Sequence, residues 1–172
     1  MKLVTGHRSK TLFAILFIAC ATARAVAQDQ PVVLAAGELA RVVPSSFYFE
    51  GQSAPTQMRN AAAARLGQKR LVIAGLVETS GYSTEIRAKY EGFFITDSAV
   101  AVGGTDVGVG AYGFGFSDDG KFNLFDIAGN RLLSVEAPKD SAIRRPRPLQ
   151  MVKASDGLRL YSGRNYVVIA AK

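Results

Sequence analysis

The chain has 172 residues, of which 48% are hydrophobic and 20% charged, the composition of one ordinary globular domain. It contains one cysteine, one histidine and no tryptophan, but 17 glycines. These counts exclude a disulfide-stapled miniprotein and a structural zinc site of the Cys/His type, because both need several such side chains. The 21 basic and 14 acidic side chains give a formal net charge of +7.

The first 27 residues have the three parts of a secretory signal peptide. Residues 11–23 are almost wholly apolar, and Ala25, Val26 and Ala27 form a cleavage site of the A-x-A type. The apolar run is shorter than the roughly 20 residues that cross a bilayer, so we expect no transmembrane helix. The start of the segment carries basic and no acidic side chains: Lys2, Arg8 and Lys10. The pattern predicts a signal peptide over 1–27, a single β domain over 28–172, and export to the periplasm or the outside of a bacterial cell.

A lipid anchor is the alternative to soluble export. Residues 16–20 loosely fit a lipobox, in which Cys20 would be lipidated and become the first residue of the mature chain. Such an anchor would tether the domain to a membrane without a spanning helix.

Removal of the signal peptide changes the chemistry of the chain. His7 and Cys20 both lie upstream of Ala27, so the mature chain would hold neither residue type. This excludes Ser-His-Asp and Cys-His catalysis and histidine metal ligands, and we expect no cofactor and no metal. Four basic residues leave with the segment and no acidic ones, so 17 basic and 14 acidic side chains remain and the net charge falls to +3. We therefore expect no nucleic-acid partner.

The first part of the predicted domain offers one clear strand and one ambiguous segment. Residues 31–43 predict one or two strands broken at Gly37, and residues 46–50 predict an aromatic strand. Residues 54–66 favour a short helix, because Ser53 is a suitable N-cap and apolar side chains recur every fourth residue. The alternative is a long strand that ends at a turn over 67–69.

The segment that follows carries the cleanest periodic pattern. Residues 70–78 predict a buried strand. Charged side chains then alternate with Ile86, Ala88 and Tyr90 over 85–91, which predicts a half-buried strand with its charges facing out. A helix capped by Ser83 is less favoured here, because it would place Ala88 on the far side from Ile86 and Tyr90.

The rest of the chain reads as short strands joined by tight turns, with a turn signal every 8 to 12 residues. The predicted fold is therefore all-β, an antiparallel β-sandwich or small β-barrel built from meander hairpins. The predicted turns contain Asp-Gly, Gly-Asn or similar pairs and lie at 117–120, 128–130, 154–157 and 162–165.

Two groups of residues are candidate binding sites. Tyr112, Phe114 and Phe116 project to one face of a strand, and the intervening glycines leave the other face open. They would either line a slot for an apolar or glycan ligand or form part of the core. Arg144, Arg145 and Arg147 stand in a proline-rich stretch that would either bind an anionic surface or form a solvated edge.

Carboxylates offer the remaining route to catalysis. Without histidine or cysteine, a pair of carboxylates is the credible means of hydrolysing a glycan, and Glu50 and Glu78 are the best placed for it. The Asp and Asn residues between 117 and 130 supply hard oxygens, but their spacing matches turns better than a calcium loop. We therefore expect no metal site there.

Together these observations favour an exported, non-enzymatic binding or interaction module. The first alternative is a glycan hydrolase that uses Glu50 or Glu78. The second is a small lipoprotein or a structural protein associated with the outer membrane.

Overall fold

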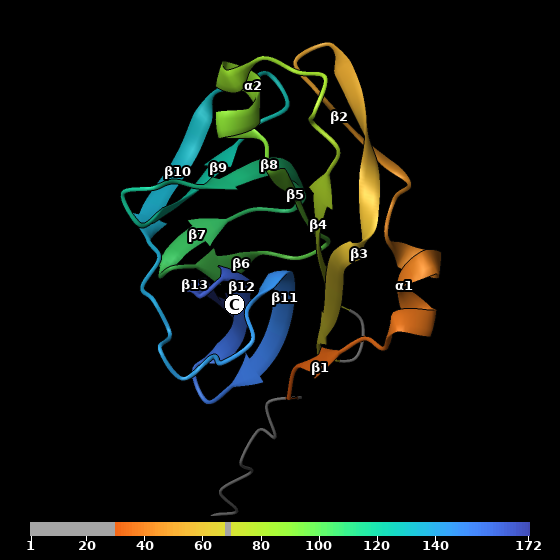
Figure 1. Ribbon diagram of the computed structural model, residues 1–172. Coiled ribbons are helices and arrows are strands. Elements are labelled where there is room, and N and C mark those ends of the chain that lie inside the picture. The colour runs from red at the N-terminus through yellow and green to blue at the C-terminus, as the bar shows by residue number, and fades with distance from the viewer. Residues whose placement is uncertain (1–29, 68–69) are drawn as a thin grey trace, which may run out of the picture.

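The computed structural model describes residues 30–67 and 70–172 of the chain. They form two antiparallel sheets with hairpin connections and two short helices (Figure 1). The predicted all-β antiparallel class is confirmed, and within the described residues the two sheets do not close into one barrel. The predicted signal peptide and Cys20 lie outside the described residues. None of the described helices is long and apolar enough to cross a bilayer.

The first sheet is the larger one. Its strands run in the order β1, β3, β4, β5, β8, β9, β10, and β2 adds to it as a hairpin partner of β3. In the long third strand, residues 52–55 pair with β2, whereas Thr56 and residues 61–66 pair with β4, with a register shift between Thr56 and Ala61. The bounds are β1 Val32–Val33, β2 Ser46–Phe49, β3 Gln52–Leu66, β4 Arg70–Val77, β5 Gly92–Thr96, β8 Gly110–Phe116, β9 Lys121–Phe125 and β10 Arg131–Glu136.

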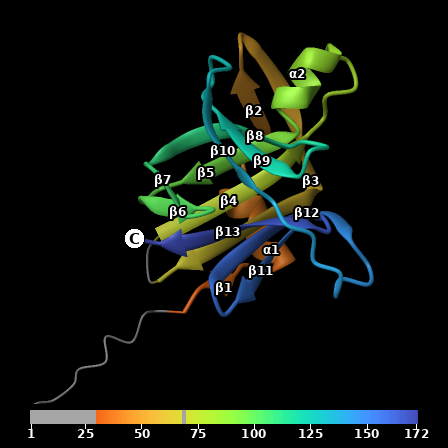
Figure 2. The same ribbon diagram turned by 90° about the vertical axis from the view of Figure 1, so that its left-hand side faces the viewer.

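The second sheet contains the C-terminal strands and one inserted hairpin. Its order is β11, β12, β13, β6, β7, so the β6–β7 hairpin from the middle of the chain extends the C-terminal meander (Figure 2). The bounds are β6 Val100–Val102, β7 Thr105–Val107, β11 Arg147–Ala154, β12 Gly157–Gly163 and β13 Asn165–Ala171.

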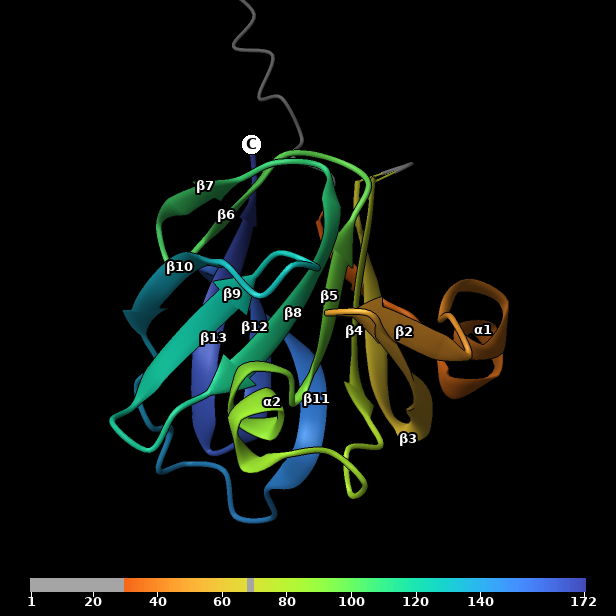
Figure 3. The same ribbon diagram turned by 90° about the horizontal axis from the view of Figure 1, so that it is seen from above.

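Two apolar clusters cover the two faces of the first sheet. Because side chains alternate along a strand, Phe94 enters the core between the sheets while its neighbour Phe93 enters the second cluster on the outer face. That outer cluster lies beneath α1 (Ala36–Val42), the β2–β3 hairpin and α2 (Thr84–Lys89). Figure 3 shows α1 and β2 on the side of the first sheet away from β11–β13.

The short helix predicted over 54–66 is wrong, and the long-strand alternative is correct. Residues 54–66 belong to β3, which pairs with a strand over nearly its whole length. Ala62 and Ala64 face the core between the sheets, and Ala63 faces the outer cluster. The small alanine side chains fill both faces of a doubly covered strand, and this packing outweighs their preference for helix.

The strands predicted over 31–43 are also largely wrong. Only Val32–Val33 form a strand, and residues 36–42 form α1. Leu39, Val42 and Val43 turn toward the outer cluster, as one face of a helix requires. The carboxylate of Glu38 accepts a hydrogen bond from the Ala35 N–H at 2.9 Å and so closes the first turn.

The half-buried strand predicted over 85–91 is wrong as well. Thr84–Lys89 form α2, which is capped by Ser83 at its N-terminus and by Tyr90 at its C-terminus, and β5 starts only at Gly92. Ser83 Oγ accepts the Ile86 N–H at 3.3 Å, and Ile86 and Tyr90 pack together in the outer cluster while Ala88 stays exposed. The less favoured alternative, a helix capped by Ser83, is therefore correct, because Ala88 lies on the exposed side of this short helix while Ile86 and Tyr90 pack inward.

The turn predictions for the second half of the chain are confirmed. Each turn carries a glycine with a positive φ, for example Gly120 at 79° between β8 and β9. This conformation costs glycine little because it lacks a Cβ.

Candidate functional site

The predicted aromatic stripe lies on β8 and faces the core between the sheets. Phe114 is fully buried and stacks on Phe122 with their ring centroids 5.6 Å apart. Tyr112 and Phe116 are half-buried against the same cluster. The packing therefore corresponds to the core interpretation of the stripe, since the central ring has no exposed surface for a ligand.

The open face beside the stripe is occupied by the chain itself. A Cβ on Gly113 would overlap the ring of Tyr90, and a Cβ on Gly115 would lie 3.0 Å from the Ala88 carbonyl oxygen. The two glycines thus let α2 approach the backbone of β8 closely. The face that the glycines leave open is therefore filled by a helix of the same chain.

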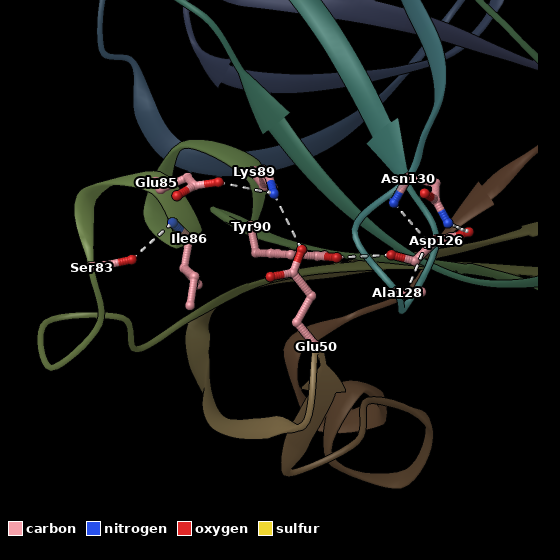
Figure 4. A network of polar contacts seen from close by, with 9 residues as sticks. All are labelled: Glu50, Ser83, Glu85, Ile86, Lys89, Tyr90, Asp126, Ala128 and Asn130. Carbon is pink, nitrogen blue, oxygen red and sulfur yellow. Dashed lines mark hydrogen bonds and ion pairs between the residues drawn. The ribbon is translucent and has the colours of Figure 1, made fainter.

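A polar network fixes α2 over the sheet (Figure 4). The Tyr90 hydroxyl donates to the Asp126 carbonyl oxygen at 2.8 Å. Burial, reinforced by the charges of Glu50 and Asp126, raises the pKa of Tyr90 to about 12. Lys89 Nζ lies 3.3 Å from Glu50 Oε1 and 3.5 Å from a carboxylate oxygen of Glu85. The hydrogen bond to Glu50 is the main reason that the pKa of Lys89 is raised.

The backbone of Glu50 is unusual. Its φ is 42°, and it is the one non-glycine residue with a positive φ among those described. Its N–H donates to the Ile127 carbonyl oxygen at 2.7 Å, which ties the β2–β3 turn to the β9–β10 turn. Left-handed backbone at a non-glycine residue persists only where its surroundings impose it.

The structure does not bring the two candidate catalytic carboxylates into contact. Glu50 lies in the turn at the tip of the β2–β3 hairpin, whereas the Glu78 N–H donates to the Pro55 carbonyl oxygen at the hairpin's open end. The Glu78 carboxylate is exposed, and hydrogen bonds to the Ser80 side chain and to the Ser80 N–H lower its pKa. A general acid in glycan hydrolysis needs the opposite shift.

The polar residues of the β9–β10 turn serve the backbone. The Asp126 carboxylate accepts hydrogen bonds from the Ala128 and Asn130 N–H groups and from the Asn130 side chain, and these lower its pKa. This is the turn chemistry expected from the sequence. Among residues 30–67 and 70–172, no three His, Cys, Asp or Glu side chains gather in a way that would hold a metal ion.

The predicted arginines lie beside cations from elsewhere in the chain. Arg147 pairs in register with Gly163, and Arg164 Nε donates to the Ile143 carbonyl oxygen at 3.1 Å. Lys139 forms an isolated bridge with Asn165. Five exposed cations thus gather at one end of the second sheet, and we call them the basic surface: Lys139, Arg144, Arg145, Arg147 and Arg164.

The loop that carries this surface is fastened to the outer face of the second sheet. The Asp140 carboxylate accepts the Tyr161 hydroxyl at 2.9 Å, and the Asp140 N–H donates to the Arg164 carbonyl oxygen. The loop covers Tyr161, which is 3% exposed, and burial raises the pKa of its phenol. Tyr166 N–H donates to the Pro138 carbonyl oxygen at 3.0 Å. The cations therefore stand on an ordered support.

The nearby carboxylates are already engaged by another arginine. Arg159 lies 2.9 Å from Asp156 and 3.9 Å from Asp140, and its guanidinium stacks over the Tyr166 ring. No ion pair in the described part of the chain involves any member of the basic surface. The surface consequently presents positive charge that no carboxylate among residues 30–67 and 70–172 pairs with.

No protein-family model, curated protein or solved structure matches this chain. The chemistry of the residues themselves is therefore the basis for assigning a function. Sequence reasoning found the three clustered arginines but missed Lys139 and Arg164. Their contribution depends on long-range contacts between the loop and the β12–β13 turn, for which the sequence carries no local signal.

Proposed function

We propose that this protein is an exported, non-enzymatic binding module that holds an acidic polysaccharide against its basic surface. The observation that carries the proposal is the group of five exposed cations that form no ion pair within residues 30–67 and 70–172. Arginine supplies a planar fork of N–H donors that matches a carboxylate, which is the charged group of uronate sugars.

The residues of the loop favour a linear polyanion over two other anionic partners. Residues 144–148 are three arginines and two prolines. They include no aromatic ring on which nucleobases would stack and no aliphatic side chain that would enter a lipid layer. Arg144 and Arg145 lie in a bend and Arg147 begins β11, so three arginines stand on one short stretch of chain, which suits several contacts along a polymer.

The expected binding is weak at each contact and strong only in sum. An exposed ion pair contributes about 0.5 kcal/mol, and salt screens it. Several simultaneous contacts along one polymer are needed before the affinity becomes useful. This argues for a polymer rather than for a single small anion as the ligand of the basic surface.

Binding to an immobilised polyuronate tests the proposal. The variant combines Arg144→Gln, Arg145→Gln and Arg147→Gln, and the matched control combines Arg41→Gln, Arg59→Gln and Arg87→Gln, which remove the same charge from exposed positions elsewhere. Three lost contacts of about 0.5 kcal/mol each weaken binding about tenfold in the first variant. The control is expected to stay close to the unmodified protein.

Two outcomes would overturn the proposal. If both triple variants lose affinity equally, net charge and not the basic surface governs binding. Vesicles of anionic phospholipid and a DNA duplex are measured in parallel. If either binds more tightly than the polyuronate, with the same dependence on Arg144, Arg145 and Arg147, the partner class is wrong.

Export is a separate part of the proposal, and it rests on the sequence of residues 1–27 alone. Intact mass spectrometry of the protein recovered from an expressing bacterium distinguishes its forms. We expect a chain that begins at Gln28, and an acylated Cys20 would instead indicate the lipoprotein. A product that retains Met1 would contradict export in either form.

A further inference from the structure

A groove of about 790 Å³ lies between α2 and the outer face of the first sheet. Glu85, Ala88 and Lys89 line it from the helix, and Ser117 and Asp119 line it from the turn between β8 and β9. Lys121, Asn123 and Phe125 line it from β9, and Arg131 and Ser134 line it from β10. None of these residues belongs to the basic surface, which stands on the second sheet.

The walls of the groove are held in place before any ligand arrives. The Tyr90 hydroxyl ties the end of α2 to the Asp126 carbonyl oxygen, and Gly113 leaves room for the Tyr90 ring. Glu50, whose backbone is left-handed, forms an ion pair with Lys89, with Glu50 Oε1 3.3 Å from Lys89 Nζ. A preformed site loses little conformational entropy when it binds a ligand.

The cations that line the groove outnumber its carboxylates, because Lys89, Lys121 and Arg131 face Glu85 and Asp119. Of its cations, Lys89 is engaged by Glu50 and Glu85, and Lys121 lies 3.9 Å from Asp119. Arg131 is exposed and forms no ion pair in the part of the chain that the structure describes. Asn123 Nδ2 donates to Ser117 Oγ at 3.2 Å, which fixes the orientation of the amide.

We propose that this groove binds a small hydroxylated oxyanion, of the size of one or two sugar units. Its volume falls within the roughly 300–1,000 Å³ of typical small-ligand sites. The Arg131 guanidinium would bind the carboxylate or phosphate through two parallel hydrogen bonds. Asn123 and Ser134, which are opposite each other in register, would bind hydroxyl groups.

Titrations followed by NMR of the backbone amides test this proposal with three probes that differ in one group: glucuronate, glucose 6-phosphate and glucose. We expect saturable shifts at Lys121, Asn123, Arg131 and Ser134 with at least one of the two anions, in the range of about 1 mM for a ligand this small. The anion that binds more tightly shows whether the groove prefers a carboxylate or a phosphate group. Neutral glucose is expected to bind at least about tenfold more weakly, because it lacks the charge-assisted contact.

Two variants assign the binding to the groove. Arg131→Gln removes the free guanidinium and is expected to weaken the preferred anion about tenfold or more. Arg41→Gln removes one exposed arginine of α1, outside both the groove and the basic surface, and is expected to leave this affinity unchanged, so the test is independent of the proposed function. The proposal is overturned if no amide of the groove shifts saturably, if glucose binds as tightly as the anions, or if Arg131→Gln has no more effect than Arg41→Gln.

Discussion

At the scale of single residues, Gly113 governs how closely α2 packs on the first sheet. A methyl group at this position would overlap the Tyr90 ring, which is fully buried and has no room to withdraw. We expect Gly113→Ala to lower the free energy of unfolding by about 2 kcal/mol, as overpacking does elsewhere. Equilibrium unfolding in urea measures this difference in the free energy of unfolding.

Gly81→Ala is the matched control, because a Cβ at Gly81 meets nothing within 4 Å. Its effect should stay within about 0.5 kcal/mol. Equal effects of the two substitutions would mean that α2 does not approach β8 as closely as described.

The raised pKa of the Tyr90 phenol makes the free energy of unfolding fall at high pH. Its pKa is raised to about 12 in the folded protein, mainly by burial, against about 10 for an exposed tyrosine. The unfolded chain therefore loses the proton first, and the stabilisation is complete below pH 10 and is lost as the pH rises toward 12. Tyr90→Phe should flatten the fall of unfolding free energy over this window. Tyr48→Phe is the control, because it removes a phenol from a side chain that is 55% exposed. If the free energy of unfolding falls equally between pH 10 and 12 in Tyr90→Phe and in Tyr48→Phe, Tyr90 is not the group responsible.

At the scale of elements, α2 is a helix whose first turn depends on one side chain. Ser83 Oγ accepts the Ile86 N–H, so Ser83→Ala should cost about 1 kcal/mol of stability, whereas Ser83→Asp preserves an acceptor and should cost little. Thermal unfolding of the two variants makes the comparison. A strand in this place would need no cap, and Ser83→Ala would then have no larger effect than Ser83→Asp.

The elements that were predicted well are those whose signals are local. The glycine turns and the apolar strand β4 follow from a few neighbouring residues. The segments at 54–66 and 85–91 fit both a helix and a strand, and the decision came from partners far along the chain. Residues 54–66 became a strand because β2 and β4 pair with it, and residues 84–89 became a helix because Gly113 and Gly115 leave room for it.

At the scale of the whole molecule, the candidate site was predictable only in part. Arg144, Arg145 and Arg147 are neighbours in the sequence, so their charge could be recognised there. The ordered loop that holds these arginines could not be predicted from the sequence. It depends on contacts between residues far apart in the chain, such as the hydrogen bond from the Tyr161 hydroxyl to the Asp140 carboxylate. The groove beside α2 was missed for the same reason: its walls come from a helix and from two strands about 40 residues further on.

The salt dependence of polyuronate binding tests the central claim most directly. A cation that neutralises a charge on a polyanion releases a counterion, so the logarithm of the binding constant falls linearly with the logarithm of the salt concentration. The slope grows with the number of cations engaged. If the five residues of the basic surface make the contact, removing Arg144, Arg145 and Arg147 should reduce the slope by more than about half, and the control at Arg41, Arg59 and Arg87 should leave it unchanged. An unchanged slope in the first variant would contradict the account.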